Sequence, residues 1–266
     1  MSRYVLNSNF KDDIQQFLNL KHSIGYKYTT SQRLIEQFDL LCFSKYPNEK
    51  ILTKEIAITW AKPRENESAS ATQNRIVVIR EFAKYLNSIN KSAFIIPTHY
   101  MPKKPKYKSY IYTNNELKKI FNVIDNGKYT YKYEMCNLVY PIMFRLFYCC
   151  GLRNTEVRNL KVKDVDVNNG IIAVYESKNN NNRLVPLTDN LKNMISEYAK
   201  HVHYTSCDDD YFFYFNDKKI QIPKATLDFA FVRILKATGI EKNKKINPRI
   251  HDFRHTFRCE LFKEIY

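Results

Sequence analysis

A short segment rich in proline and lysine constrains the fold of this chain more than any other feature. Residues 97–110 read Pro-Thr-His-Tyr-Met-Pro-Lys-Lys-Pro-Lys-Tyr-Lys-Ser-Tyr. Closely spaced prolines stop helices and favour a stiff, extended backbone, and the lysines make that backbone cationic. The sequence therefore predicts two domains, residues 1–96 and 112–266, which are joined by a basic linker over residues 97–111.

The first domain has the apolar periodicity of short amphipathic helices. In the first of these segments Phe10, Ile14, Phe17 and Leu18 fall on one stripe, and Gly25 follows its end. Apolar side chains at such spacing bury one face of a helix, and several such helices pack as a bundle. Four helices are expected, which begin near residues 8, 30, 53 and 70.

The second domain changes from helical to strand periodicity. It opens with a capping box, Thr113-x-x-Glu116, and an apolar helix that contains Pro141 ends near residue 150. Strands are expected at 164–167, 171–175 and 183–187, and helices at 189–201, 224–238 and 251–266. Residues 211–215 fit either a strand or a buried turn. The predicted fold class is mostly α (α+β), with a small antiparallel three-stranded sheet.

The charge of the chain indicates a polyanionic partner. The 266 residues have a net charge of +16 and an isoelectric point near 9.4. The excess is spread along the chain, whereas a membrane-surface protein usually gathers its charge on one amphipathic helix. Such a distribution favours a polyanion over a membrane surface. The alternative is a generally basic protein from a Lys- and Asn-rich proteome.

Other sequence features exclude several classes. No signal peptide and no apolar run of membrane-spanning length are present, and the six cysteines form no C-x-x-C pair. We therefore expect a cytoplasmic protein with reduced thiols and no membrane partner. Only 5 glycines occur, without a glycine-rich phosphate loop, so neither a bound nucleotide nor another cofactor is expected.

Three local motifs together supply what a phosphate site needs. Arg153 follows Gly-Leu, Lys178 precedes the Arg183 strand, and His251 and Arg254 form a His-x-x-Arg motif. Guanidinium groups match phosphate oxygens in pairs, and fixed cations stabilise the extra charge of a phosphoryl transition state. Lysine and histidine can also transfer a proton. Each residue alone would more often be an ordinary surface side chain.

In these motifs and their order the chain resembles the tyrosine recombinases of the phage integrase family. Residues 113–260 carry the specific motifs, whereas the part before residue 98 matches only in type, as a helical (SAM-like) core-DNA-binding domain. The resemblance implies that Arg153 and Arg254 clamp the scissile phosphate and that Lys178 is the general acid on a hairpin that reaches the minor groove. It further implies that His251 assists proton transfer. Glu156 would brace Arg153. His255 is expected to pack near the site or to support its residues, and not to be a catalyst.

The same resemblance implies site-specific recombination or integration of DNA, as in mobile elements and transposition. The two domains would close as a C-shaped clamp around duplex DNA, and a tyrosine would form a 3′-phosphotyrosyl intermediate without ATP or metal. Relatives of full length act as homotetramers on DNA. The expected DNA contacts of this chain are Lys103, Lys104, Lys106, Lys108 and Arg183.

One departure from the family pattern concerns the nucleophile. The family's tyrosine lies some thirty residues beyond the His-x-x-Arg motif, whereas Tyr266 follows Arg254 by only twelve positions. We therefore expect the nucleophile to be missing from these 266 residues, with Tyr266 not in that role. The chain alone is expected to be a monomer that forms no phosphotyrosyl intermediate. A catalytically inactive DNA-binding protein or fragment derived from an integrase is the alternative function.

A metal site is the other reading of the last motif. His251 and His255 are four positions apart, which lets two imidazoles on one helix bind the same ion. A zinc peptidase would have glutamate where Asp252 stands, and Arg254 between the two ligands would repel a cation. No metal is therefore expected.

Overall fold

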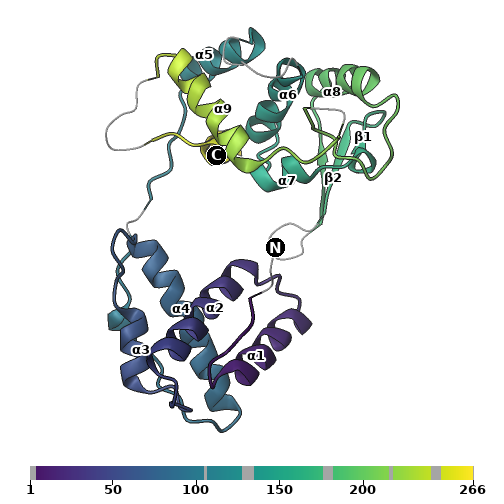
Figure 1. The fold of residues 1–266 in the computed structure, drawn as a ribbon. Helices are drawn as coiled ribbons and strands as arrows, with labels where there is room; N and C mark the ends of the chain where they lie inside the picture. The colour runs from purple at the N-terminus through teal and green to yellow at the C-terminus, as the bar shows by residue number, and fades with distance from the viewer. Residues whose placement is uncertain are drawn as a thin grey trace. The chain divides into compact units, whose positions relative to one another are not determined.

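The computed structural model describes residues 4–104, 107–127, 135–175, 182–215, 218–240 and 247–265. The chain divides into two compact units, residues 1–107 and 108–266 (Figure 1). Each unit has its own hydrophobic core.

The first unit is a helical bundle. Its helices are α1 (Lys11–Ser23), α2 (Thr29–Lys45), α3 (Lys54–Ala61) and α4 (Ala69–Ser88), followed by the 3-10 turn η1 (Thr98–Tyr100). The apolar stripes face inward as predicted, and Phe17, Phe38 and Phe82 are almost completely buried in the core. Thr53 and Ser68 cap α3 and α4 by accepting backbone N–H bonds through their hydroxyls.

A buried arginine closes one side of this bundle. The Arg75 guanidinium binds both carboxylate oxygens of Glu67, with Nε to Oε1 at 2.9 Å and Nη2 to Oε2 at 2.7 Å. It also donates to the backbone carbonyls of Trp60 and Lys62 and lies over the Trp60 ring, 4.9 Å from its centre. The charge is buried but fully paired, as buried charges must be.

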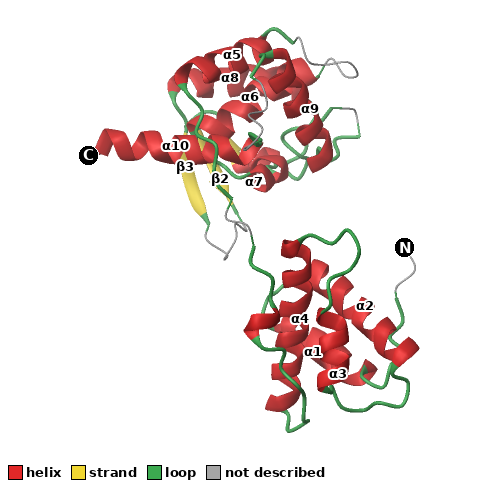
Figure 2. Cartoon of the chain, turned by 90° about the vertical axis from the view of Figure 1, so that its left-hand side faces the viewer, coloured by secondary structure: helices red, strands yellow, loops and turns green. Residues whose placement is uncertain are grey.

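The second unit is mostly helical with one small sheet (Figure 2). Its helices are α5 (Asn114–Asp125), α6 (Cys136–Cys149), α7 (Asn154–Asn159), α8 (Asp189–Val202), α9 (Lys224–Ala237) and α10 (Ile250–Ile265), and a 3-10 turn η2 (Val162–Asp164) precedes the sheet. The predicted capping box is confirmed, because the Thr113 hydroxyl and the Glu116 carboxylate each accept the other's backbone N–H.

The sheet is antiparallel, in the order β1 (Val165–Asp166), β2 (Ile171–Val174) and β3 (Arg183–Pro186). The predicted fold class is therefore confirmed, although all three strands are shorter than expected. Val174 in β2 is paired with Arg183 in β3, which sets the position of Arg183 in the ladder. Tyr211 forms one isolated bridge with Lys161, and Phe212, Phe213 and Tyr214 are buried outside any strand, so this segment is a buried turn.

Helix α10 is fixed to the start of the unit by two contacts. The Thr256 hydroxyl accepts the backbone N–H of Tyr112 at 3.0 Å, and the Tyr112 ring stacks on Phe253 with a centroid distance of 4.8 Å. Phe253 is completely buried and also meets Phe144 of α6 edge to face. These contacts orient the helix that carries the His-x-x-Arg motif.

Within the described part of the chain, no helix combines the length and the apolar character that crossing a bilayer requires.

Candidate phosphate site

The loop between α6 and α7 brings the first arginine of the motif close to α10. Gly151 has a φ of +57°, a conformation that residues with a side chain rarely adopt, and a Cβ there would lie 2.5 Å from the Phe257 ring. A glycine thus lets the loop pass directly against α10. Arg254 uses this proximity, because one of its terminal nitrogens donates to the Gly151 carbonyl. Arg153 follows two positions later, at the N-cap of α7.

Glu156 binds two arginines. Its carboxylate accepts the backbone N–H of Arg153 at 2.8 Å and the Arg153 side chain at 2.5 Å. The Arg183 fork binds the same carboxylate, with nitrogen–oxygen distances of 3.1 and 2.7 Å. Burial alone would raise the pKa of Glu156, but the bonds from Arg183 and Arg153 prevail and hold that pKa at about 2. The carboxylate therefore stays ionised at any physiological pH.

Arg153, Arg183, Arg254 and Glu156 form what we call the arginine cluster. Burial lowers the pKa of Arg254, and the neighbouring charges of Arg258, Arg153 and Arg183 lower it further. Two guanidiniums bind one carboxylate here and the third, that of Arg254, is close enough to feel its charge, so the cluster keeps an excess of positive charge. The side chains of Arg153 and Arg183 are 32% and 33% exposed, which leaves donors within reach of an anion.

The two histidines lie on α10 next to the cluster. Their rings are nearly perpendicular, with centroids 4.9 Å apart. Burial, then the charges of His255 and Arg254, lower the pKa of His251, which favours its neutral form at neutral pH. Among the residues that the structure describes, no group of three or more His, Cys, Asp or Glu side chains gathers as a metal site.

Several residues predicted for the site lie outside the described residues. These are Lys178, the linker lysine Lys106 and Tyr266. Lys103, Lys104 and Lys108 are exposed, and the Lys104 ammonium donates to Asn74 at 3.0 Å.

Two features of the site were missed at the level of sequence. Arg258 adds its charge to the cluster, and its place four positions after Arg254 on one helix face could have indicated this. The contact between Glu156 and Arg183 joins α7 to β3 across 27 positions, and no local pattern indicated it.

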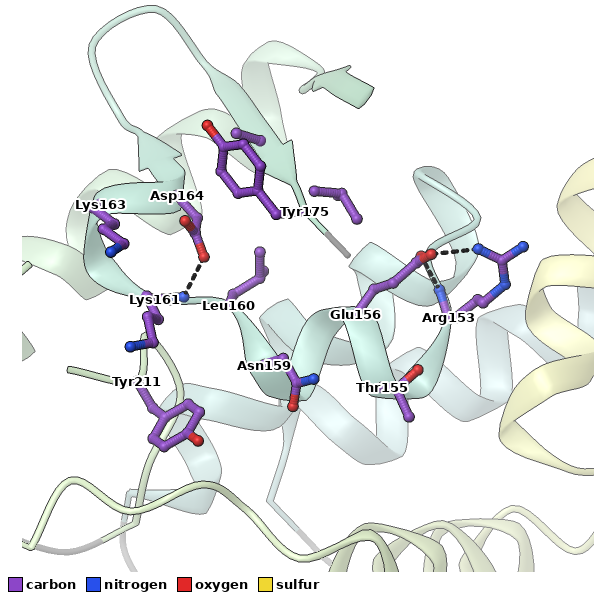
Figure 3. Close-up of a pocket in the computed structure, with 12 residues that line it drawn as sticks. Arg153, Thr155, Glu156, Asn159, Leu160, Lys161, Lys163, Asp164, Tyr175 and Tyr211 are labelled. Atoms are coloured by element: carbon purple, nitrogen blue, oxygen red, sulfur yellow. Dashed lines mark hydrogen bonds and ion pairs between the residues drawn. The ribbon is translucent and has the colours of Figure 1, made fainter. Parts of the chain in front are cut away.

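A groove leads away from Arg153 (Figure 3). Its volume is about 830 Å³, and its lining runs from Arg153 and Glu156 past Asn159 to Lys161 and Lys163. The two lysines share one carboxylate oxygen of Asp209, at 3.1 and 2.7 Å. Tyr175 and Tyr211 supply aromatic surface in the same groove.

Several solved structures share this fold. The Tn1549 transposon integrase, solved in complex with transposon right end DNA, superposes with a TM-score of 0.67 at 14% identity, covering 95% of this chain and 87% of that one. The XerH site-specific recombinase bound to palindromic difH substrate superposes with a TM-score of 0.63 at 17% identity, covering 89% of this chain and 68% of that one.

Sequence comparison identifies the family. A Sinorhizobium fredii protein named "Putative integrase/recombinase y4rB" is 23% identical over 266 residues, which cover 97% of this chain and 83% of that protein. The tyrosine recombinase XerC of Chlamydia caviae is 26% identical over 196 residues, and the match spans 73% of this chain and 59% of XerC. The model of the phage integrase family matches residues 111–265, which include the whole arginine cluster and both histidines. The chain therefore belongs to the phage integrase family.

Proposed function

We propose that this protein is a site-specific DNA recombinase of the tyrosine recombinase type, in which Arg153 and Arg254 clamp the scissile phosphate. One observation carries the proposal: the two residues meet at a single loop, since Arg254 binds the Gly151 carbonyl and Arg153 follows two positions later. Two neighbouring arginines that are both only partly buried can form a site for one phosphate, whose oxygens guanidiniums bind in pairs.

The neighbouring side chains fit the remaining steps. Attack by a tyrosine on the phosphorus forms a phosphotyrosyl ester and releases a 5′-oxygen, which must be protonated. Lys178 is proposed as the general acid for that oxygen. The neutral His251 donates a hydrogen bond to the phosphate and can exchange a proton with it. The ester conserves the energy of the broken bond, so that a second 5′-hydroxyl can reverse the step.

Duplex DNA is the proposed partner. The net charge of +16 and the exposed linker lysines favour a polyanion. Both structural neighbours described above were solved with DNA. We propose that the two units bind DNA together as a C-shaped clamp, with residues 97–111 following the backbone, and that strand exchange proceeds in a tetramer.

Tyr266 is not the proposed nucleophile. Helix α10 is continuous from Ile250 to Ile265. Tyr266 follows Arg254 by only twelve positions, whereas the family's tyrosine lies some thirty residues beyond the His-x-x-Arg motif. We therefore expect residues 1–266 alone to bind DNA without forming a covalent adduct.

Neutral phosphate replacement tests the clamp. A binding site is first selected from random duplexes, and each phosphate of that site is then replaced by an uncharged methylphosphonate. At one position per strand the replacement should weaken binding by the wild-type chain about tenfold or more, but should have little effect on Arg254→Gln, whose contact is already lost. If every methylphosphonate weakens binding equally for the wild-type chain and for Arg254→Gln, the proposal is contradicted.

A nicked suicide substrate of the same sequence tests the nucleophile. No gel-stable protein–DNA adduct is expected with this chain. An adduct that disappears in Tyr266→Phe would assign the nucleophile to Tyr266.

A further inference from the structure

We propose that Arg183 is a positioning residue: by binding Glu156 it keeps that carboxylate from drawing Arg153 and Arg254 away from the phosphate. The inference rests on the proposed function of these two arginines. It gives Arg183 a role different from the direct DNA contact expected from the sequence.

The hydrogen bonds of Glu156 are divided evenly between two arginines. Oε1 accepts from the side chains of Arg153 at 2.5 Å and Arg183 at 3.1 Å. Oε2 accepts from the backbone N–H of Arg153 at 2.8 Å and from Arg183 at 2.7 Å. A carboxylate offers about four acceptor sites, so the set is complete. Both terminal nitrogens of Arg183 are directed to Glu156.

The position of Arg183 comes from the sheet and not from α7. Arg183 begins β3, and its partner in the ladder is Val174, which is 2% exposed. The sheet thus holds the Arg183 fork against a carboxylate that belongs to α7. Because Glu156 has a side chain only 4% exposed, water cannot readily replace the Arg183 bonds.

Loss of Arg183 would leave a buried carboxylate with two empty acceptor sites. The charged groups that face Glu156 would then be Arg153 on its own helix and Arg254 on α10, with Arg258 one turn further along α10. An ionised Glu156 would compete with the phosphate for these guanidiniums. Protonation of Glu156 would end the competition, because a neutral carboxyl attracts them far less.

The test compares Arg183→Gln with the wild-type chain in affinity for the selected duplex. Arg145→Gln is the matched control, because Arg145 forms a bidentate pair of the same kind with Asp125 at 2.8 Å in the same unit. We expect Arg183→Gln to lose about tenfold in affinity at pH 7 and the control to lose almost none. Arg183→Lys, which keeps the charge but not the fork, should recover only part of the loss.

Two further readouts separate positioning from a structural role. The second substitution Glu156→Gln should restore much of the affinity of Arg183→Gln, since it removes the competing charge. In Arg183→Gln the pKa of Glu156 should rise above its wild-type value of about 2, which carboxyl-carbon NMR measures. The affinity deficit of this variant should also shrink as pH falls through that raised pKa. A merely structural role predicts neither effect.

Each other outcome has a definite meaning. A deficit that Glu156→Gln leaves unchanged at every pH overturns the proposal. Another outcome is a slope of log affinity against log salt that decreases in Arg183→Gln by the contribution of about one phosphate. That result would show that Arg183 contacts DNA directly, and it would also overturn the positioning proposal. If Arg153→Gln and Arg254→Gln bind the duplex like wild type, the proposed function fails. The positioning proposal can still be judged in that case, from the pKa of Glu156 without DNA. If this pKa is the same in Arg183→Gln as in the wild-type chain, Arg183 does not hold the carboxylate.

Discussion

Each unit of the molecule contains an arginine that binds a carboxylate through two nitrogens, and the two sites differ in what remains free. In the first unit Arg75 directs its donors to Glu67 and to two backbone carbonyls, and its side chain is 2% exposed. In the second unit Glu156 is almost as buried, but its arginines are about one-third exposed. The same pair of functional groups is therefore a sealed structural element in one place and a candidate binding site in the other.

The comparison shows why residue type and pairing do not identify a functional arginine. Surplus positive charge and unoccupied donors do so. Glu67 binds one guanidinium, that of Arg75, and feels the charge of Arg64, whereas Glu156 binds two guanidiniums and feels the charge of a third, that of Arg254. A site with more cations than anions is prepared for an anionic ligand, and the native protein tolerates the repulsion at some cost in stability.

The largest effect is expected on stability, from Arg75→Ala. This change removes a buried side chain and takes a hydrogen-bond donor from the partly buried Glu67 and from the Trp60 and Lys62 carbonyls, which costs about 3 kcal/mol in the free energy of unfolding. Trp60, the single tryptophan of the chain, lies in the first unit, so the urea midpoint of its fluorescence reports on that unit. Adding Glu67→Gln should recover part of the loss. A loss below about 1 kcal/mol would mean that the pair is not a structural element.

Arg254→Gln should have the opposite profile. It removes a hydrogen bond to Gly151 but also relieves repulsion with Arg153 and Arg258, so the free energy of unfolding should change by less than about 1 kcal/mol. Affinity for the selected duplex should fall about 100-fold, because a charged contact to the phosphate is lost. Titration with labelled DNA and urea unfolding measure the two quantities. If Arg254→Gln loses stability but keeps its affinity for DNA, Arg254 has a structural role like that of Arg75.

Acid should weaken both units. The pKa values of Glu67 and Glu156 are lowered from 4.5 to about 2. A carboxylate with a depressed pKa stabilises the folded state above its unfolded pKa, and that stabilisation is lost as pH falls from about 4.5 towards 2. The urea midpoint of Trp60 fluorescence should therefore depend less on pH in Glu67→Gln than in the wild-type chain. In Glu156→Gln it should depend on pH as it does in the wild-type chain. Equal responses of the two variants would show that the carboxylates do not act separately.

The smallest effect concerns the linker. Lys104→Ala should reduce the slope of log affinity against log salt by about 0.9, the contribution of one neutralised phosphate. Lys200→Ala is a suitable control, because Lys200 is exposed and paired with Glu197 on α8. Replacing Lys103, Lys104, Lys106 and Lys108 together should flatten the slope by several units. An unchanged slope in the quadruple variant would remove the linker from the proposed DNA interface.

Helices and their ends were predictable because their signals are local. The Thr113–Glu116 capping box joins residues three positions apart, and the stripe from Phe10 to Leu18 spans two turns of one helix. The segment 211–215 could not be assigned in advance, because its aromatic side chains fit a strand or a buried turn equally well. Its state depends on Leu160 and Lys161, which bond to it from fifty positions away.

The sequence by itself determined the helical and strand periodicity, the excess of positive charge, and the order of the motifs that identify the family. Only the tertiary structure decided which arginines share a carboxylate. It also determined that Gly151 must lack a side chain because Phe257 lies against it, and that Arg183 binds Glu156. The reason is physical: periodicity and capping depend on neighbours within one or two turns, whereas charge sharing depends on distances of a few ångströms between α7, β3 and α10, which only the packed core sets.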